Sequence, residues 1–370
     1  MITSHNVGHT AGHCHNAAFH NSVAEIPAAL ADGANGGNHN DFPRLPGEKN
    51  DSLRIQRAID ASPSEVLYFP AGIYEIATPL NIKNLCSLLL HKNAILKAIA
   101  AMDFILHVDC DLQHNKKLRT SDMPEDYNLF IRGGQIDGNA LASCLALSRY
   151  HHFSLADSTF LNGRKFGLFV DENQQYGYEL IANNLYFKTV LSGLAGNVAV
   201  YACGGDSHYT DIVIVDYTVG FRFVEHGWAN RLTRCHVWGG PLPPRREGDL
   251  PEMLKDSICF DLKVGGNILR DCYADTGAIG YLIGADTRLL GCSYYSNPIF
   301  KLDNIRCIKH NQGILLVADN TFTKTSEHVK IYEGSGKNVI WRDNTTYGFT
   351  AEEIPCFSML QTENTMIKQS

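Results

Sequence analysis

The sequence lacks long apolar runs and has little charge. Charged residues make up 19% of its 370 residues and hydrophobic residues 44%. That is too little charge for a disordered chain and enough apolar material for a large core. No apolar run approaches the roughly 18 residues of a membrane span. Residues 1–6 also lack the basic and apolar regions of a secretory signal. We therefore expect no membrane partner.

A basic net charge and nucleotide-binding motifs are absent as well. The chain has 32 Lys and Arg against 39 Asp and Glu, a formal net charge of −7. A general nucleic-acid binder should be basic, so no nucleic-acid partner is expected. No Gly-rich phosphate loop or dinucleotide fingerprint occurs in a strand-to-helix context, and we expect no cofactor.

The eleven cysteines are an odd number without close pairs. This predicts reduced, buried thiols in a cytoplasmic protein; a secreted chain whose signal has been removed is the alternative. Residues 1–48 are rich in His, Asn and Gly without a period, which predicts an irregular arm. His13, Cys14 and His15 are metal-ligand types, but no second pair stands at a zinc spacing, so no metal is expected.

A helix and two strands are predicted after the arm. Asp51 is the expected N-cap. The apolar positions of the helix are Leu53, Ile55, Ala58 and Ile59. Residues 66–76 predict a strand, a Pro-Ala-Gly turn and a second strand.

An internal repeat runs from about residue 127 onward. Its frame has an apolar residue, a small or amide residue three positions later, and an apolar or small residue two positions after that. The copies begin at Ile131, Leu155, Ile181, Ile214, Leu232, Leu269, Leu289, Val317 and Trp341. A repeat of roughly 20–30 residues built from short strands is typical of a β-solenoid, since each unit must stack to bury its apolar face. A β-sandwich with chance spacing is the alternative.

The fourth position of the frame predicts side-chain ladders. Cys235, Cys272 and Cys292 share this position and should form an inward ladder of small side chains. Asn184, Asn320 and Asn344 share it too, and should hydrogen-bond along the stack or at a bend.

Two segments, Asn50 to Asp60 and Val66 to Tyr74, resemble the start of the pectate-lyase-like superfamily. The run Gly133 to Asn139 resembles that superfamily's "G-IDGN" coil. The resemblance covers roughly residues 50–346. It implies an all-β fold, a right-handed parallel β-helix with a short N-terminal capping helix and an "FPAG-Y" hairpin leading into the first coils. The expected parts are an arm at 1–48, the β-helix at 49–346 and a tail at 347–370. Several relatives form trimers, so a homotrimer is possible.

The resemblance implies carbohydrate chemistry without fixing the reaction. The superfamily includes polygalacturonase-type hydrolases, pectate lyases, uronan epimerases, inulin fructotransferases and phage tail spikes. We find no paired-aspartate or Gly-His-Gly motif of polygalacturonases. Phe223 to His226 resembles the Asp-Pro-His motif of epimerases only at the histidine, so no catalytic set is carried over.

Polar residues are densest in and between two apparent insertions, at 191–209 and 240–256. Glycosidic cleavage commonly uses two carboxyl groups, and neighbouring coils ~4.8 Å apart supply such pairs. Glu225 with Asp206 is the preferred catalytic pair, Asp216 is the reserve, and His226 orients a carboxylate or a hydroxyl. The predicted substrate-binding residues of the same lateral groove are Trp228, His208, Arg245, Arg246 and Trp238.

Two further polar pairs carry less weight. Asp171 and Glu172 follow an apolar run and are expected to form a turn. Arg164 and Lys165 are a single basic pair, expected on a solvated face, although such a pair can bind an anionic sugar.

Three functions remain open. The first is an enzyme that cleaves or transfers a glycosidic bond of an oligo- or polysaccharide with carboxylates. The second is a uronate lyase or epimerase, which needs a base and a cation against the substrate carboxylate. The third is a non-catalytic glycan-binding or spike-like protein.

Overall fold

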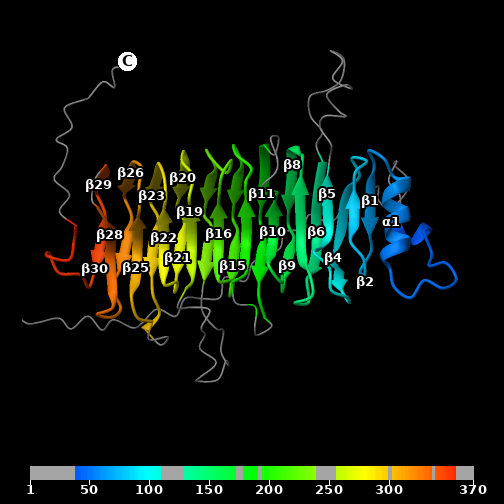
Figure 1. Ribbon diagram of the computed structural model, residues 1–370, viewed down its shortest axis with the longest axis horizontal. Coiled ribbons are helices and arrows are strands. Elements are labelled where there is room, and N and C mark those ends of the chain that lie inside the picture. Colours follow the sequence, from blue (N-terminus) through cyan, green and yellow to red (C-terminus); the bar gives the residue numbers. More distant parts are fainter. Residues whose placement is uncertain are drawn as a thin grey trace, which may run out of the picture. The chain divides into compact units, whose positions relative to one another are not determined.

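The protein is described from a computed structural model. The structure describes residues 38–109, 129–171, 178–190, 194, 196–238, 256–298, 302–335 and 338–355. These residues form one ten-residue helix followed by short strands that stack in parallel, coil upon coil (Figure 1). The predicted all-β parallel β-helix with a short capping helix is confirmed.

Three columns of parallel strands make up the β-helix, and each full coil contributes one strand to each. Column I holds β1 (Val66–Phe69), the first part of β4 (Ser87–Ala98) and of β6 (Leu129–Asp137), β8 (His151–Ala156), β11 (Tyr178–Asn183), β14 (His208–Thr210), β17 (Arg231–Thr233), β20 (Asn267–Arg270), β23 (Thr287–Leu290), β26 (Leu315–Ala318) and β29 (Val339–Arg342). Column II holds β2 (Gly72–Ile76), the later parts of β4 and β6, β9 (Thr159–Leu161), β12 (Tyr186–Lys188), β15 (Val213–Val215), β18 (His236–Trp238), β21 (Tyr273–Asp275), β24 (Ser293–Tyr295), β27 (Thr321–Thr323) and β30 (Thr345–Tyr347).

Column III is a separate ten-stranded sheet. It holds β3 (Leu80–Ile82), β5 (Phe104–Asp109), β7 (Ser143–Ser148), β10 (Phe166–Val170), β13 (Val198–Ala202), β16 (Val219–Phe223), β19 (Ile258–Leu262), β22 (Ile279–Ile283), β25 (Ile305–His310) and β28 (Val329–Gly334). We call the connections the I–II, II–III and III–I bends.

From β8 onward, the I–II bend of each coil contains one residue in the left-handed region. Asp157, Asp211 and Asp271 adopt φ of 55°, 53° and 52° there. Asp, Asn and Gly tolerate this conformation best, because a short polar side chain bonds locally or no Cβ clashes. The bend falls one residue before the fourth position of the repeat frame, so the frame marks where each coil turns.

The strand register confirms the repeat frame except in its third and fourth copies. Ala182, not Ile181, pairs with Leu155, and Ile181 is 42% exposed while Ala182 is buried. Ile214 pairs with Phe187 and Val237 at the frame's sixth position. That copy therefore begins at Tyr209. Successive side chains of a strand face opposite sides of the sheet. The predicted copy at Ile181 was one residue out of register, so it assigned Ile181 to the inside and Ala182 to the outside, the reverse of the structure.

The predicted cysteine ladder is confirmed, because the Cys272 thiol contacts those of both Cys235 and Cys292. The amide ladder is confirmed in part. Asn320 Nδ2 donates to Asn344 Oδ1 at 2.9 Å. Asn184 also hydrogen-bonds at a bend, as predicted, but to an aspartate: its exposed Nδ2 donates to Asp157 Oδ1 of the preceding bend at 2.8 Å. All eight cysteines in the described ranges are buried and free of disulfides, as predicted.

A second ladder of small residues runs inside column III. Its members are Cys144, Gly167, Ala199, Gly220, Cys259, Gly280 and Cys307. They face large side chains of column II: a Cβ on Gly220 would lie 2.6 Å from a Val237 methyl, and one on Gly280 would lie 2.4 Å from the Tyr294 ring. Small residues at these positions let columns II and III approach each other. This accounts for three further cysteines, Cys144, Cys259 and Cys307.

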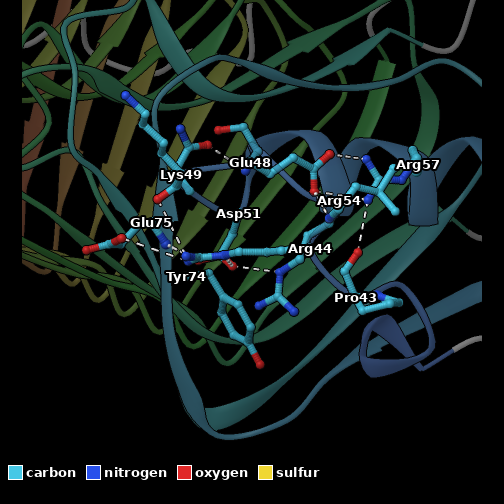
Figure 2. Close-up of polar contacts among 12 residues, drawn as sticks. Pro43, Arg44, Glu48, Lys49, Asp51, Arg54, Arg57, Tyr74 and Glu75 are labelled. Atoms are coloured by element: carbon cyan, nitrogen blue, oxygen red, sulfur yellow. Dashed lines mark hydrogen bonds and ion pairs between the residues drawn. The ribbon is translucent and has the colours of Figure 1, made fainter.

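The helix α1 (Ser52–Ala61) covers the first coil and is tied down by an ion-pair network (Figure 2). Asp51 occupies the predicted N-cap position but makes no side-chain cap bond. Its buried carboxylate instead accepts hydrogen bonds from Arg44 Nε at 2.9 Å, Arg54 Nε at 2.6 Å and the Glu75 N–H at 2.7 Å. Leu53 is 57% exposed, contrary to prediction, whereas the other predicted apolar positions of the helix are buried.

Strands β1 and β2 appear where expected, but they do not form a hairpin. Both pair in parallel with β4, because the Pro-Ala-Gly segment acts as a bend between two columns. Within the predicted arm, Glu48 pairs with Arg57 of the helix. The proposed domain bounds remain predictions. No helix in the described ranges has the length and apolar character of a membrane span.

Candidate functional site

Five predicted site residues lie at or beside the III–I bend of two adjacent coils. Asp206 and His208 follow β13, whereas Glu225, His226 and Trp228 follow β16. The Asp206 N–H donates to the Trp228 carbonyl at 3.1 Å, which joins the two coils. All five are exposed.

Trp228 packs against the backbone of the preceding coil at Gly205. A Cβ built on Gly205 would lie 2.4 Å from Trp228 Cδ1, so the ring needs a glycine beneath it. The ring is nevertheless 52% exposed. A tryptophan supported from below and open above suits contact with a sugar ring.

The structure does not bring the other predicted residues to this bend. Asp216 is buried at the II–III bend, and strand β16 separates it from Glu225. Trp238 lies on the outer face of column II. Arg245 and Arg246 fall in the chain between β18 and β19 and lie outside the described residues. The predicted residues therefore do not line a single groove. The first apparent insertion contains the column III strand β13, so Asp206 and His208 lie beyond that strand, at or beside the III–I bend, whereas the second insertion stands in the chain between β18 of column II and β19 of column III.

The sequence analysis missed an aromatic patch on the outer face of column III, formed by Phe104, Phe166, Phe169 and Tyr201. Phe104 and Phe169 have ring centroids 5.5 Å apart, and Phe169 and Tyr201 are 5.4 Å apart. Phe166 contacts all three of the others. Each ring is half-buried.

Strand register explains how side chains so distant in sequence meet. His107, Ala146, Phe169 and Tyr201 occupy one row across successive coils. The small Ala146 leaves space between β5 and β10, and Phe104 reaches across it. The patch thus spans four coils.

A polar cluster adjoins this patch where column III ends; we call His107, Asp109, Ser148, Arg149 and Asp171 the His107 cluster. His107 Nε2 lies 2.9 Å from Ser148 Oγ, which donates to Asp171 Oδ2 at 3.2 Å. Arg149 Nε donates to Asp109 Oδ1 at 2.6 Å. Register places Ser148 between the two carboxylates, with Asp109 one coil before it and Asp171 one coil after.

Burial lowers the pKa of His107 despite the raising effect of nearby Asp109 and Asp171. The imidazole is therefore neutral near pH 7. With Ser148 donating to Asp171, the neutral ring donates Nε2–H to Ser148. A chain of hydrogen bonds thus leads from His107 through Ser148 to Asp171.

The strand before Asp171 ends at Val170, and the Asp171 carboxylate accepts a hydrogen bond from Ser148. Glu172 lies outside the described residues. Arg164 and Lys165 are exposed as expected, and they line a small pocket with Met102, Asp103 and Ser143 beside the aromatic patch. One signal was available in the sequence: Asp109, Ser148 and Asp171 all stand where an apolar run of column III ends.

No protein-family model and no curated protein matches this sequence. Solved structures do match. The tailspike of E. coli bacteriophage HK620, in complex with a hexasaccharide, has a TM-score of 0.55 and 14% identity over 87% of this chain and 68% of that one. The A-module of the Azotobacter vinelandii mannuronan C-5 epimerase AlgE4 has a TM-score of 0.54 and 14% identity over 84% and 95%. The likeness shows that this chain shares the parallel β-helix fold of these proteins.

A Geobacillus virus E2 protein, ORF18, also matches at a TM-score of 0.47 and 15% identity; the match covers 84% of this chain but only 60% of that one. At such identities the likeness shows the fold alone. Within the described part of the chain, no three His, Cys, Asp or Glu side chains come together as a metal site.

Proposed function

We propose that the protein is a carbohydrate-active enzyme that cleaves or transfers a glycosidic bond on the outer face of column III. The observation that carries this proposal is the aromatic patch beside two carboxylates that flank Ser148. Aromatic rings offer apolar surface to the faces of sugar rings. Carboxyl pairs are the usual catalytic groups of glycoside hydrolysis.

The spacing of Asp109 and Asp171 favours a water-mediated reaction. They lie two coil steps apart, which is ~9.6 Å between backbones at the usual strand spacing. Inverting enzymes hold their carboxyl groups roughly 6.5–9.5 Å apart, so that a water fits beside the sugar. In this arrangement Asp171, linked to His107 through Ser148, exchanges a proton with the glycosidic oxygen. Asp109, held by Arg149, activates the water.

Charge-neutral substitutions test these roles. Asp109→Asn and Asp171→Asn should each reduce turnover by about 10²–10⁴-fold with little change in unfolding midpoint. Asp157→Asn is the matched control, since this aspartate pairs with Arg132 at the distant I–II bend. The substrate is found first by screening the wild-type protein on fructans, uronans and glucans. Full activity in both site variants would contradict the proposal.

Glu225 with Asp206 remains a second candidate pair, because the two residues lie at the III–I bend on adjacent coils. The His107 cluster lies where column III strands enter the same type of bend in earlier coils. Glu225→Gln should abolish cleavage if this pair is catalytic. If instead the His107 cluster is catalytic, Glu225→Gln should alter only the binding of the outer part of the substrate. Unchanged turnover would exclude Glu225 as a catalytic residue.

One observation favours a lyase or epimerase as the alternative reaction. A neutral His107 is a suitable base for abstracting a proton beside a uronate carboxylate, and Arg149 is a cation close to it. A lyase would give an unsaturated product that absorbs in the ultraviolet, whereas hydrolysis would give none. Binding without any product would indicate a glycan-binding protein.

A further inference from the structure

A second group of rings lies on the outer face of column II, away from the His107 cluster. Tyr186, His236 and Tyr273 stand in one row of the strand register, together with Val213. Trp238 and Tyr295 stand in the neighbouring row, with Asp275 between them. We call these six ring and acid residues the Trp238 face: Tyr186, His236, Trp238, Tyr273, Asp275 and Tyr295.

The centre of this face is held rigidly. The His236 and Tyr273 rings stack with centroids 4.6 Å apart and planes 13° from parallel. Asp275 Oδ1 accepts a hydrogen bond from Thr276 Oγ1 at 2.5 Å. All six residues of the face are half-buried, so each has a fixed base and an accessible outer part.

Polar groups between the rings keep hydrogen-bonding capacity. His236 Nε2 lies 3.7 Å from Asp275 Oδ2, which exceeds a direct hydrogen bond. That nitrogen is itself buried and has no hydrogen-bond partner among the residues the structure describes, so it is not open to a ligand. The Asp275 side chain beside it is 16% exposed and can accept a hydrogen bond from a ligand. Burial and the neighbouring Asp216 raise the pKa of Tyr186, so its hydroxyl remains a donor at neutral pH.

From the rings and these polar groups, we propose that the Trp238 face is a second saccharide-binding surface, and that its ligand is an uncharged oligosaccharide. Rings with hydrogen-bonding groups set between them match a molecule with apolar ring faces and hydroxyl edges. Asp275 stands between Trp238 and Tyr295 in the register, and its carboxylate opposes an anionic sugar there. The same carboxylate opposes a second copy of the chain, since the cores of protein interfaces are depleted of charge. The surface does not depend on the reaction proposed for column III.

The three tryptophans of the chain allow a direct test, since Trp228, Trp238 and Trp341 lie in different places. The double variant Trp228→Phe with Trp341→Phe leaves Trp238 as the single tryptophan reporter. Trp341 stacks on Phe322, and phenylalanine keeps that ring contact. Cellohexaose, maltohexaose and inulin-type oligosaccharides would each be titrated while tryptophan emission is recorded.

A saturable change in Trp238 emission is expected with at least one of these sugars. Adding Tyr273→Ala should weaken that binding by at least about tenfold, the usual effect of truncating a central aromatic contact. Adding Asp171→Asn should leave it unchanged, which separates this surface from the proposed reaction. No emission change with any of the sugars would overturn the proposal. Tryptophan emission could instead change with protein concentration, and sedimentation could show dimers or trimers. That result would overturn the proposal and indicate that the Trp238 face binds a second copy of the chain.

Discussion

Gly220→Ala is the sharpest test of the strand register on which the site depends. Gly220 lies in the small-residue ladder of column III, and its φ is not in the left-handed region. An added Cβ would lie 2.5 Å from the Cys259 carbonyl oxygen and 2.6 and 2.8 Å from the two Val237 methyl groups. Real Cβ contacts are longer, so column III must move away from column II.

Overpacking of this kind costs about 1–3 kcal/mol, and contact with backbone places Gly220→Ala near the upper end. The entropy of unfolding is about 2.1 cal/mol/K per residue, roughly 0.8 kcal/mol/K for the whole chain. A cost of about 2–3 kcal/mol therefore lowers the melting temperature by ~3–4 °C if unfolding is cooperative.

Circular dichroism at rising temperature gives the measurement, with Gly265→Ala as the matched control. Gly265 also lacks a positive φ, but its added Cβ would meet neighbours only at 3.4–3.6 Å, an ordinary contact. An equal melting temperature for wild type and Gly220→Ala would refute the register in these coils, and with it the placement of the aromatic patch.

Three further outcomes follow from individual side chains. Ser148→Ala breaks the path from His107 to Asp171 and should lower kcat by about 10–10²-fold at nearly unchanged KM, measured by steady-state kinetics. His107 has a lowered folded pKa, so the unfolded chain binds its proton first as pH falls below about 6.5. The stability that the neutral ring contributes is then lost, and His107→Gln should show a smaller drop in melting temperature between pH 7 and about pH 5. Asp51→Asn removes the charge that Arg44 and Arg54 bind and should cost about 2–4 kcal/mol, seen as a lower urea midpoint with wild-type turnover.

The fold was predictable because one feature recurs in every coil from β8 onward. A left-handed residue followed by a small, amide or apolar one marks each of these I–II bends, and the frame copies at Leu232, Leu269 and Leu289 stand in register as predicted. The frame slipped by one residue at Ile181, where two apolar residues are adjacent and the pattern alone cannot say which side chain faces inward. At Ile214 the copy was started five residues late: Tyr209 and Ile214 both face inward, and a column II position was taken for the column I position.

The candidate site was less predictable, because its residues face outward and come from different coils. Phe104 and Tyr201 share a patch only because Ala146 leaves space between their strands. Outward positions carry no repeating constraint, so no spacing in the sequence marks them. The predicted pair Glu225 and Asp206 was placed on adjacent coils correctly, whereas Asp216 was not, because the column III strand between the two bends was overlooked.

The most direct measurement is a crystal structure of the Asp171→Asn variant with its saccharide bound. The account predicts a sugar chain over Phe104, Phe166, Phe169 and Tyr201, with a glycosidic oxygen between Asp109 and the substituted residue. A chain bound beside Glu225 and Trp228, with the column III face empty, would contradict it.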